Sequence, residues 1–154
     1  MAISVRAAIA TDAEHLVRCN CGLATETEDI DLAHGTVLAG VRAALSDPTK
    51  GFYLVAEDDG APVGALLVTD EWSDWNNAYY WWIQSVFVLP EHRSKGAYGA
   101  LHREVERLAR ERTDVCSIRL YVATHNARAK AVYDALGMVA GRYDFYETDL
   151  RETF

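Results

Sequence analysis

The 154-residue sequence has few cysteines and no long apolar run, and each shortage excludes a class of protein. Its three cysteines, Cys19, Cys21 and Cys116, are an odd number without an export signal, so we expect reduced thiols in a cytoplasmic protein. Cys19 and Cys21 have only His15 nearby as a further ligand, so no metal site is predicted. No apolar stretch approaches the roughly 18 residues of a membrane span, and the N-terminal residues are typical of a strand.

The charge balance is acidic, with 15 lysines and arginines against 23 aspartates and glutamates and a formal net charge of −8. This balance argues against a nucleic-acid or anionic-membrane partner, because both repel a negative protein. Small cationic substrates are attracted instead. Half of the residues are hydrophobic, which at this length predicts one globular domain with one sizeable core.

Hydrophobic periodicity predicts a mixed α/β fold in the order β-α-α-β-β-β-α-β-α-β. The expected strands are Ile3–Ala7, Phe52–Ala56, Val63–Thr69, Tyr79–Leu89 and Ser117–Val122, and Met138–Glu147 is expected to form a last strand or a hairpin. The expected helices begin at Ala13, Leu32, Ala97 and Ala127. Between them lie an acidic connection at Glu26–Asp31, a hairpin turn at Asp58–Gly60 and a polar turn at Asp70–Ala78. We expect His92, His102 and His125 on the surface.

The stretch Ile83–Glu104 is the most informative part of the chain, because it reads as a strand, a basic turn and a helix. Pro90 lacks a backbone N–H and ends the strand, and Arg93–Gly99 forms the turn. The unpaired N–H groups of the helix start, its dipole and the side chains of Arg93 and Lys95 favour an anion, most plausibly a phosphate. The turn matches neither a P-loop nor a G-x-G-x-x-G fingerprint.

Two motifs resemble the GNAT family of N-acetyltransferases, and the resemblance runs from Val5 to about Glu147. The turn fits the family pattern Arg/Gln-x-x-Gly-x-Gly/Ala, except that Tyr98 stands where glycine or alanine is usual. The second motif, Asn-x-x-Ala-x-x-x-Tyr-x-x-x-Gly-Met, is matched by Asn126, Ala129, Tyr133, Gly137 and Met138. Short segments such as EWSDW, WWIQSV and GAYGAL look like a bacterial branch whose acceptors are mostly unassigned.

The resemblance implies a coenzyme A site between two central parallel strands that splay apart. The residues it implicates are Val86, Val88, Arg93, Ser94, Lys95, Gly96, Ala97, Tyr98, Gly99 and Asn126. In the family the tyrosine lies beside the thioester sulfur, so Tyr133 is the expected general acid. The alternative is that Asn126 only caps a helix and Tyr133 only packs.

Acidic residues are the candidates for binding or deprotonating an amine acceptor. Glu26 and Glu28 follow the first helix, while Asp70 and Glu71 precede the central strand; His34 is a weaker candidate. We favour Glu71 as the base because Trp72 and Trp75 could form an aromatic wall around a cation. The alternative is that all four are solvated loop carboxylates. One of the two aromatic sets in Tyr79–Trp82 is expected to line an acceptor pocket or a dimer contact.

The sequence therefore predicts an acyl-CoA-dependent N-acyltransferase with acetyl-CoA as donor and a small primary amine as acceptor. The alternative from another class is a non-catalytic acyl-CoA-binding or sensing module of the same fold. No metal is expected, and an exposed sheet edge is compatible with a homodimer.

Overall fold

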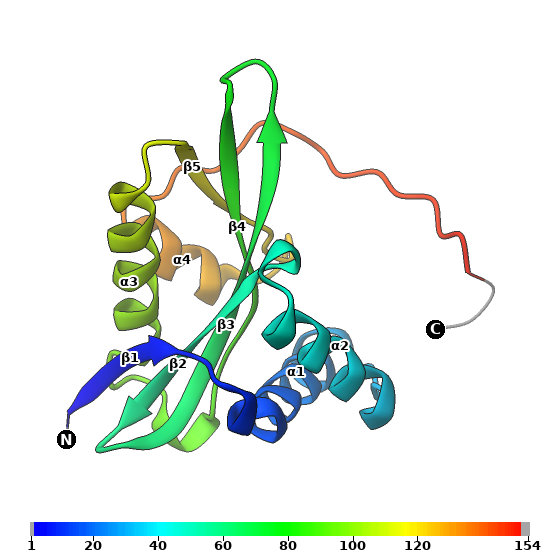
Figure 1. Ribbon diagram of the computed structural model, residues 1–154, viewed down its shortest axis with the longest axis vertical. Helices are drawn as coiled ribbons and strands as arrows, with labels where there is room; N and C mark the ends of the chain where they lie inside the picture. Colours follow the sequence, from blue (N-terminus) through cyan, green and yellow to red (C-terminus); the bar gives the residue numbers. More distant parts are fainter. Residues whose placement is uncertain (1, 152–154) are drawn as a thin grey trace. The chain divides into compact units, whose positions relative to one another are not determined.

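The computed structural model describes residues 2–151 and divides into two compact units, which are described separately. The first unit extends to Tyr121 and contains a single five-stranded sheet (Figure 1). The strands, in both chain and sheet order, are β1 (Ile3–Ala7), β2 (Phe52–Asp58), β3 (Ala61–Ser73), β4 (Ala78–Val88) and β5 (Val115–Leu120). The first three pairings are antiparallel and β4–β5 is parallel, so the predicted mixed α/β fold is confirmed.

Helices lie on both faces of this sheet. They are α1 (Ala13–Glu28), α2 (His34–Ser46) and α3 (Ala97–Glu111), and short 3-10 turns precede α1, β2 and α3. The predicted hairpin between β2 and β3 is confirmed, because Asp59 and Gly60 both have left-handed φ, 49° and 84°, as a two-residue type I′ turn requires. Within residues 2–151, no helix combines the length and apolar character needed to span a membrane.

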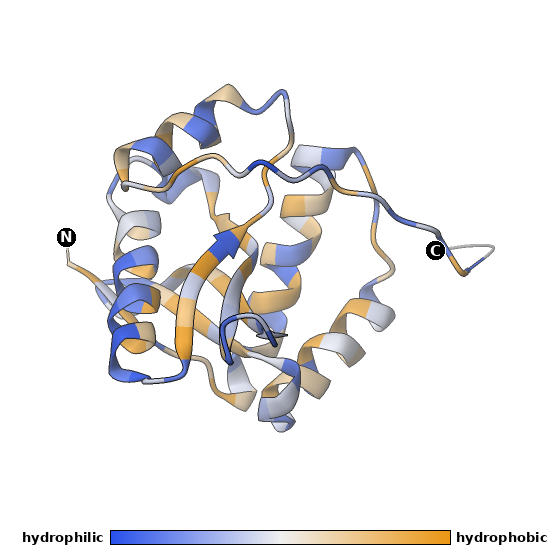
Figure 2. Cartoon of the chain, turned by 90° about the horizontal axis from the view of Figure 1, so that it is seen from above, coloured by the Kyte–Doolittle hydropathy of each residue, from blue (hydrophilic) through white to orange (hydrophobic). Residues whose placement is uncertain are grey.

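Two hydrophobic cores form because side chains alternate between the faces of each strand. On one face, α3 packs on Leu54, Leu66 and Trp81, and Figure 2 shows the apolar residues of the helices turned toward the sheet. On the other face, α1 and α2 pack on Val55 and Phe87. A Cβ atom on Gly22 would lie 2.8 Å from the Phe87 ring, so glycine lets α1 approach β4 at this point. The cores thus clamp β4 from both sides at its C-terminal end.

Two of the boundaries that differ from the prediction change where acidic candidate residues lie. Helix α1 continues to Glu28, because no residue stops it before Asp29, which has the left-handed φ of 54° and caps the helix. Strand β3 continues to Ser73, because Asp70 and Glu71 pair with Trp81 and Tyr80 of β4. The candidate acceptor residues Glu26, Glu28, Asp70 and Glu71 therefore lie on a helix or a strand and not in loops.

The predicted strand Met138–Glu147 does not form, and described residues from 136 to 151 carry no regular structure. The segment alternates apolar and polar residues, but the second unit contains only helix α4 (Ala127–Ala135) and offers no strand to complete a ladder. The surface assignment of His102 was also wrong. It is 2% exposed, because it lies on the core-facing stripe of α3 between Tyr98 and Glu106.

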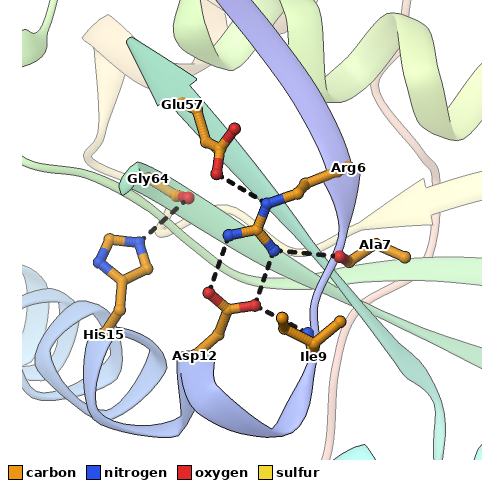
Figure 3. Close-up of polar contacts among 7 residues, drawn as sticks. All are labelled: Arg6, Ala7, Ile9, Asp12, His15, Glu57 and Gly64. Atoms are coloured by element: carbon orange, nitrogen blue, oxygen red, sulfur yellow. Dashed lines mark hydrogen bonds and ion pairs between the residues drawn. The ribbon is translucent and has the colours of Figure 1, made fainter. Parts of the chain in front are cut away.

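A partly buried ion cluster ties β1 to the start of α1 and to β2 (Figure 3). Arg6 donates to both carboxylate oxygens of Asp12, at 2.8 and 3.0 Å, and its Nε donates to Glu57 at 2.7 Å. Asp12 also accepts the Ile9 N–H at 2.7 Å and is 5% exposed. The Arg6 guanidinium holds the pKa of Asp12 below its ordinary value. Asp12 thus bonds to Arg6 and does not cap α1 with its side chain.

We expect Asp12→Asn to lower the free energy of unfolding by about 1–3 kcal/mol at pH 7, because Arg6 loses its charged partner. The folded pKa of Asp12 lies below the ordinary 3.8, so its contribution is present above that value. The contribution is lost as the pH falls through the lower, folded pKa. Urea unfolding of both proteins from pH 7 downward measures the difference. Asp31→Asn is the exposed control, and a difference that persists undiminished in acid would contradict the assignment.

Candidate functional site

Strand β4 extends beyond its pairing with β5, the edge strand of the sheet. Their parallel pairing runs from Tyr79 opposite Val115 to Ile83 opposite Leu120. Strand β4 then continues to Val88, paired with β3 but not with β5. The predicted residues Val86 and Val88 lie on this stretch, so a ligand with amide groups has a backbone edge to pair with, as an added strand would. The pairing thus ends before the C-terminal end of β4, while the predicted splay of the two strands stays a prediction.

A β-bulge at Ser85 marks the same point on the other edge of β4. The pairing with β3 shifts register between Ala65 and Leu67, and Ser85 adopts a left-handed φ of 52°. A non-glycine residue in this region is uncommon and stores about 1–3 kcal/mol of strain. Bulges bend a strand and re-aim its side chains. Sequence reasoning missed Ser85, because neither Gly nor Asn marks the position.

The turn after β4, predicted as an anion cradle, has a backbone conformation that suits this role. A 3-10 turn, Pro90–His92, leads to Ser94 and Gly96, whose φ values are 62° and 88°. Helix α3 begins at Ala97, and its first intrahelical bond runs from Ala100 N to Gly96 O. The N–H groups before Ala100 therefore have no helical acceptor, and alternating left-handed residues turn backbone N–H groups toward one point. Together they suit a phosphate oxygen.

Arg93 contacts the end of β4 and α1. Its Nε donates to the Val88 carbonyl at 2.9 Å, and its Nη2 lies 2.7 Å from Glu26 Oε2. Its guanidinium also lies 5.1 Å from the centroid of the Phe87 ring. The structure thus joins a predicted cofactor residue to a predicted acceptor residue. In this arrangement Arg93 fixes the cradle to β4 and α1.

The other side chains of the turn divide into exposed and packed ones. Ser94 and Lys95 are exposed, whereas Ala97 is buried against the α3 core. Tyr98 points along α3, with its hydroxyl 3.4 Å from His102 Nδ1. Gly99 follows in the first turn of the helix. The cradle therefore offers backbone N–H groups and one exposed ammonium.

Behind β4, His15 and Cys19 of α1 are held as neutral groups. His15 Nε2 lies 3.3 Å from the carbonyl oxygen of Gly64 and 3.6 Å from Cys19 Sγ. Burial lowers the pKa of His15 and raises the pKa of Cys19 to about 12. No group of three potential metal-ligating side chains occurs in residues 2–151.

The second signature lies in the second unit. Asn126 is the N-cap of α4, because its Oδ1 accepts the Ala129 N–H at 3.1 Å. Gly137, with φ 84°, ends the helix in a Schellman motif in which Met138 N donates to Tyr133 O and Gly137 N to Asp134 O. The predicted helix and both of its ends are confirmed. Tyr133 is half-buried in its second turn.

The predicted acceptor residues do not gather at one point. Glu28 is exposed at the end of α1, and Trp75 is 90% exposed in the hairpin turn between β3 and β4. Glu71 accepts a hydrogen bond from Trp82 Nε1 at 3.2 Å. Trp72 packs edge-on against Tyr79. The ring beside Glu71 is therefore that of Trp82, and the proposed wall of Trp72 and Trp75 does not form.

The chain matches the model of the Acetyltransferase (GNAT) family over residues 14–138. A search of curated proteins found no match. A crystal structure of a possible acetyltransferase from Clostridium difficile 630 is 35% identical, with a TM-score of 0.91 over 99% of this chain and 100% of that one.

More distant structures share the fold alone. Ribosomal-protein-alanine N-acetyltransferase from Brucella melitensis is 18% identical, with a TM-score of 0.73 over 99% of this chain and 100% of that one. Aminoglycoside N-acetyltransferase AAC(6')-Iy in complex with CoA is 20% identical, with a TM-score of 0.76 over 96% of this chain and 95% of that one. The similarity spans both units of the chain.

We expect Arg93→Lys to loosen the cradle although it keeps the charge, because an ammonium cannot hold Val88 and Glu26 as the guanidinium fork does. Unfolding should become easier by about 1 kcal/mol, and acetyl-CoA binding should weaken about tenfold. Arg42→Lys, the same exchange at an exposed arginine of α2, is the control. Urea unfolding and calorimetry measure the two effects, and an Arg93→Lys variant with wild-type stability and affinity would contradict the positioning role.

Proposed function

Because the chain belongs to the GNAT acetyltransferase family, we propose that it transfers an acetyl group from acetyl-CoA to a small primary amine in the cytoplasm. The observation that carries this proposal is the parting of β4 and β5 beside the cradle at the start of α3. One part suits the amide-bearing pantetheine arm and the other suits its pyrophosphate. The CoA complex of AAC(6')-Iy, a protein of the same fold, supports this choice of donor.

The chemistry assigns each group a step. The amine nitrogen attacks the thioester carbonyl, a C–N bond forms and the C–S bond breaks. A backbone N–H on the stretch Val86–Val88 stabilises the oxyanion, because a fixed donor costs no reorganisation when charge develops. Tyr133 gives its proton to the leaving thiolate, and Asn126 orients the pantetheine arm. In the net reaction an ammonium and acetyl-CoA become an amide, a thiol and one released proton.

The ammonium must lose a proton before it can attack, because alkylamines are charged at neutral pH. Glu71 is the proposed base, since its carboxylate is exposed on β3 beside the ring of Trp82. Glu26, held to Arg93, and Glu28 are proposed to attract the cationic acceptor at the end of α1. Trp75 is proposed to contact the acceptor from the hairpin turn. The acidic net charge of −8 acts in the same direction.

We expect acetyl-CoA at 100 times its dissociation constant to stabilise the wild-type protein by about 2.7 kcal/mol. Gly96→Glu should abolish most of this shift, because its side chain adds negative charge at the cradle. Gly96→Ala is the matched control. Both substitutions impose about 1 kcal/mol of strain at a left-handed φ, and a Cβ atom here has no neighbour within 4 Å.

Thermal unfolding and calorimetry with acetyl-CoA measure these shifts. Gly96→Ala should bind nearly as well as the wild type, so a loss confined to Gly96→Glu identifies charge and bulk as the cause. Equal affinity of Gly96→Glu and the wild type would overturn the cradle assignment.

We expect Tyr133→Phe to leave acetyl-CoA affinity unchanged and to lower kcat about 100-fold, because the thiolate would depart without a proton donor. Tyr143→Phe makes the same chemical change at an exposed tyrosine of the second unit. Thiol release with a panel of amines measures the rate. A full rate in Tyr133→Phe would contradict its role as general acid. A wild type that binds acetyl-CoA but transfers to no amine would favour the sensing module.

A further inference from the structure

One face of the first unit carries two opposite charges that are not paired with each other. Its residues, named here the open face, are Glu71, Tyr80, Trp82, Arg119 and Tyr121. Glu71 pairs in register with Tyr80, and Trp82 pairs with Arg119, so β3, β4 and β5 each contribute to it. These residues alternate with the neighbours that pack toward α3, so they lie on the opposite face.

The helices on that side leave this part of the sheet uncovered within the first unit. Helices α1 and α2 pack around Tyr53, Val55 and Phe87, whereas the far half of the β3–β4 hairpin extends beyond them at the top of Figure 1. Glu71 is exposed, and Trp82 and Arg119 are half-buried. The rings therefore have a role other than filling the α1–α2 core.

The side chains of the open face are held in place. The guanidinium carbon of Arg119 lies 3.5 Å from the centroid of the Tyr80 ring, and Asn76 Nδ2 donates to the Tyr80 hydroxyl at 2.8 Å. Trp82 stacks on Tyr121 with ring centroids 4.5 Å apart, and its indole N–H donates to Glu71. Stacking fixes the direction of a guanidinium while leaving its N–H fork available.

Arg119 has no carboxylate partner among residues 2–151, although the chain carries 23 acidic residues. Other arginines of this unit, such as Arg6, Arg107 and Arg112, are paired with one or two acids each. Glu71 likewise has no cationic partner in the described chain. The open face thus presents one fixed cation and one fixed anion across a ring.

The open face adjoins the point where the strands part. Trp82 and Arg119 form the last pair but one of the β4–β5 ladder, and Ile83 with Leu120 form the last. One residue along a strand is about 3.3 Å, so a ligand on Trp82 lies beside the point where the β4–β5 pairing ends. An acyl group bound where the β4–β5 pairing ends would therefore lie close to such a ligand.

We propose that the open face binds the acceptor and that this acceptor is a small amine that also bears a carboxylate, such as an amino acid. The inference rests on the proposed acetyl transfer. Glu71 receives the ammonium, Arg119 receives the carboxylate through its N–H fork, and the ring of Trp82 contacts the carbon atoms between them. Adjacent strands are about 4.8 Å apart, so side chains from β3 and β5 that lean over β4 span a ligand of this size. A polycationic acceptor is disfavoured, because Arg119 repels it.

The test compares each amino acid with its amide, which removes the carboxylate charge and keeps the amine. Alanine, phenylalanine and their amides are offered with acetyl-CoA, and thiol release is followed. We expect the wild type to prefer each acid over its amide by about tenfold or more in kcat/KM, as a charge-assisted pair provides. Arg119→Gln should raise KM for the acids about tenfold, leave kcat nearly unchanged and leave the amides unaffected.

The control is Arg110→Gln, which makes the same charge change on the last turn of α3. It should retain the wild-type preference. The inference is overturned if amides are used as well as acids, if Arg119→Gln affects both classes equally, or if it weakens acetyl-CoA binding instead. Transfer to amides alone would overturn the inference and leave the proposed function standing. Failure to bind acetyl-CoA would overturn the proposed function itself.

Discussion

The loss of pairing between β4 and β5 after Ile83 and Leu120 is the constraint on which the site depends. Backbone N–H and C=O groups need partners, so the edge of β4 that β5 does not pair has groups available to water or a ligand. The pairing with β5 ends close to Ser85, where β4 also bulges against β3. The pairing of β4 is therefore irregular on both of its edges near Ile83–Ser85. The two cores hold β4 in this form from both faces.

The same strand would separate the proposed donor and acceptor sites, because its side chains alternate between the two faces of the sheet. Trp81 and Ile83 face the α3 core, while Tyr80 and Trp82 face away from it. The donor cradle follows from the C-terminal end of β4, where the chain turns into α3. Because α1 and α2 cover only the region around Phe87, the other half of that face is not covered by helices of the first unit. A bisubstrate reaction needs two such sites, because each substrate must approach the same thioester carbon from its own side.

The sequence predicted those features that depend only on neighbouring residues, such as helix caps and turns. Gly96 and Gly137 take the left-handed φ that their motifs require, and Asn126 caps α4 as its position suggested. Register across strands is not local, so the contact between Glu71 and Trp82 could not be predicted from spacing. The placement of Glu71 in a turn failed because β3 extends through Ser73 on pairings with β4. A strand pattern alone was also insufficient at residues 138–147, because a ladder needs a second strand within reach.

Arg93 and Arg119 differ in whether their charge is already paired within the protein. Arg93 lies in the turn that suits phosphate, yet its guanidinium is occupied by Val88 and Glu26. Phosphate recognition therefore falls mainly on backbone N–H groups, which a substitution of side chains alters little. Arg119 is stacked and unpaired in the described chain, so its charge remains available to a ligand. In the proposed function the backbone would recognise the part that all acyl-CoA donors share, and side chains would distinguish the acceptor.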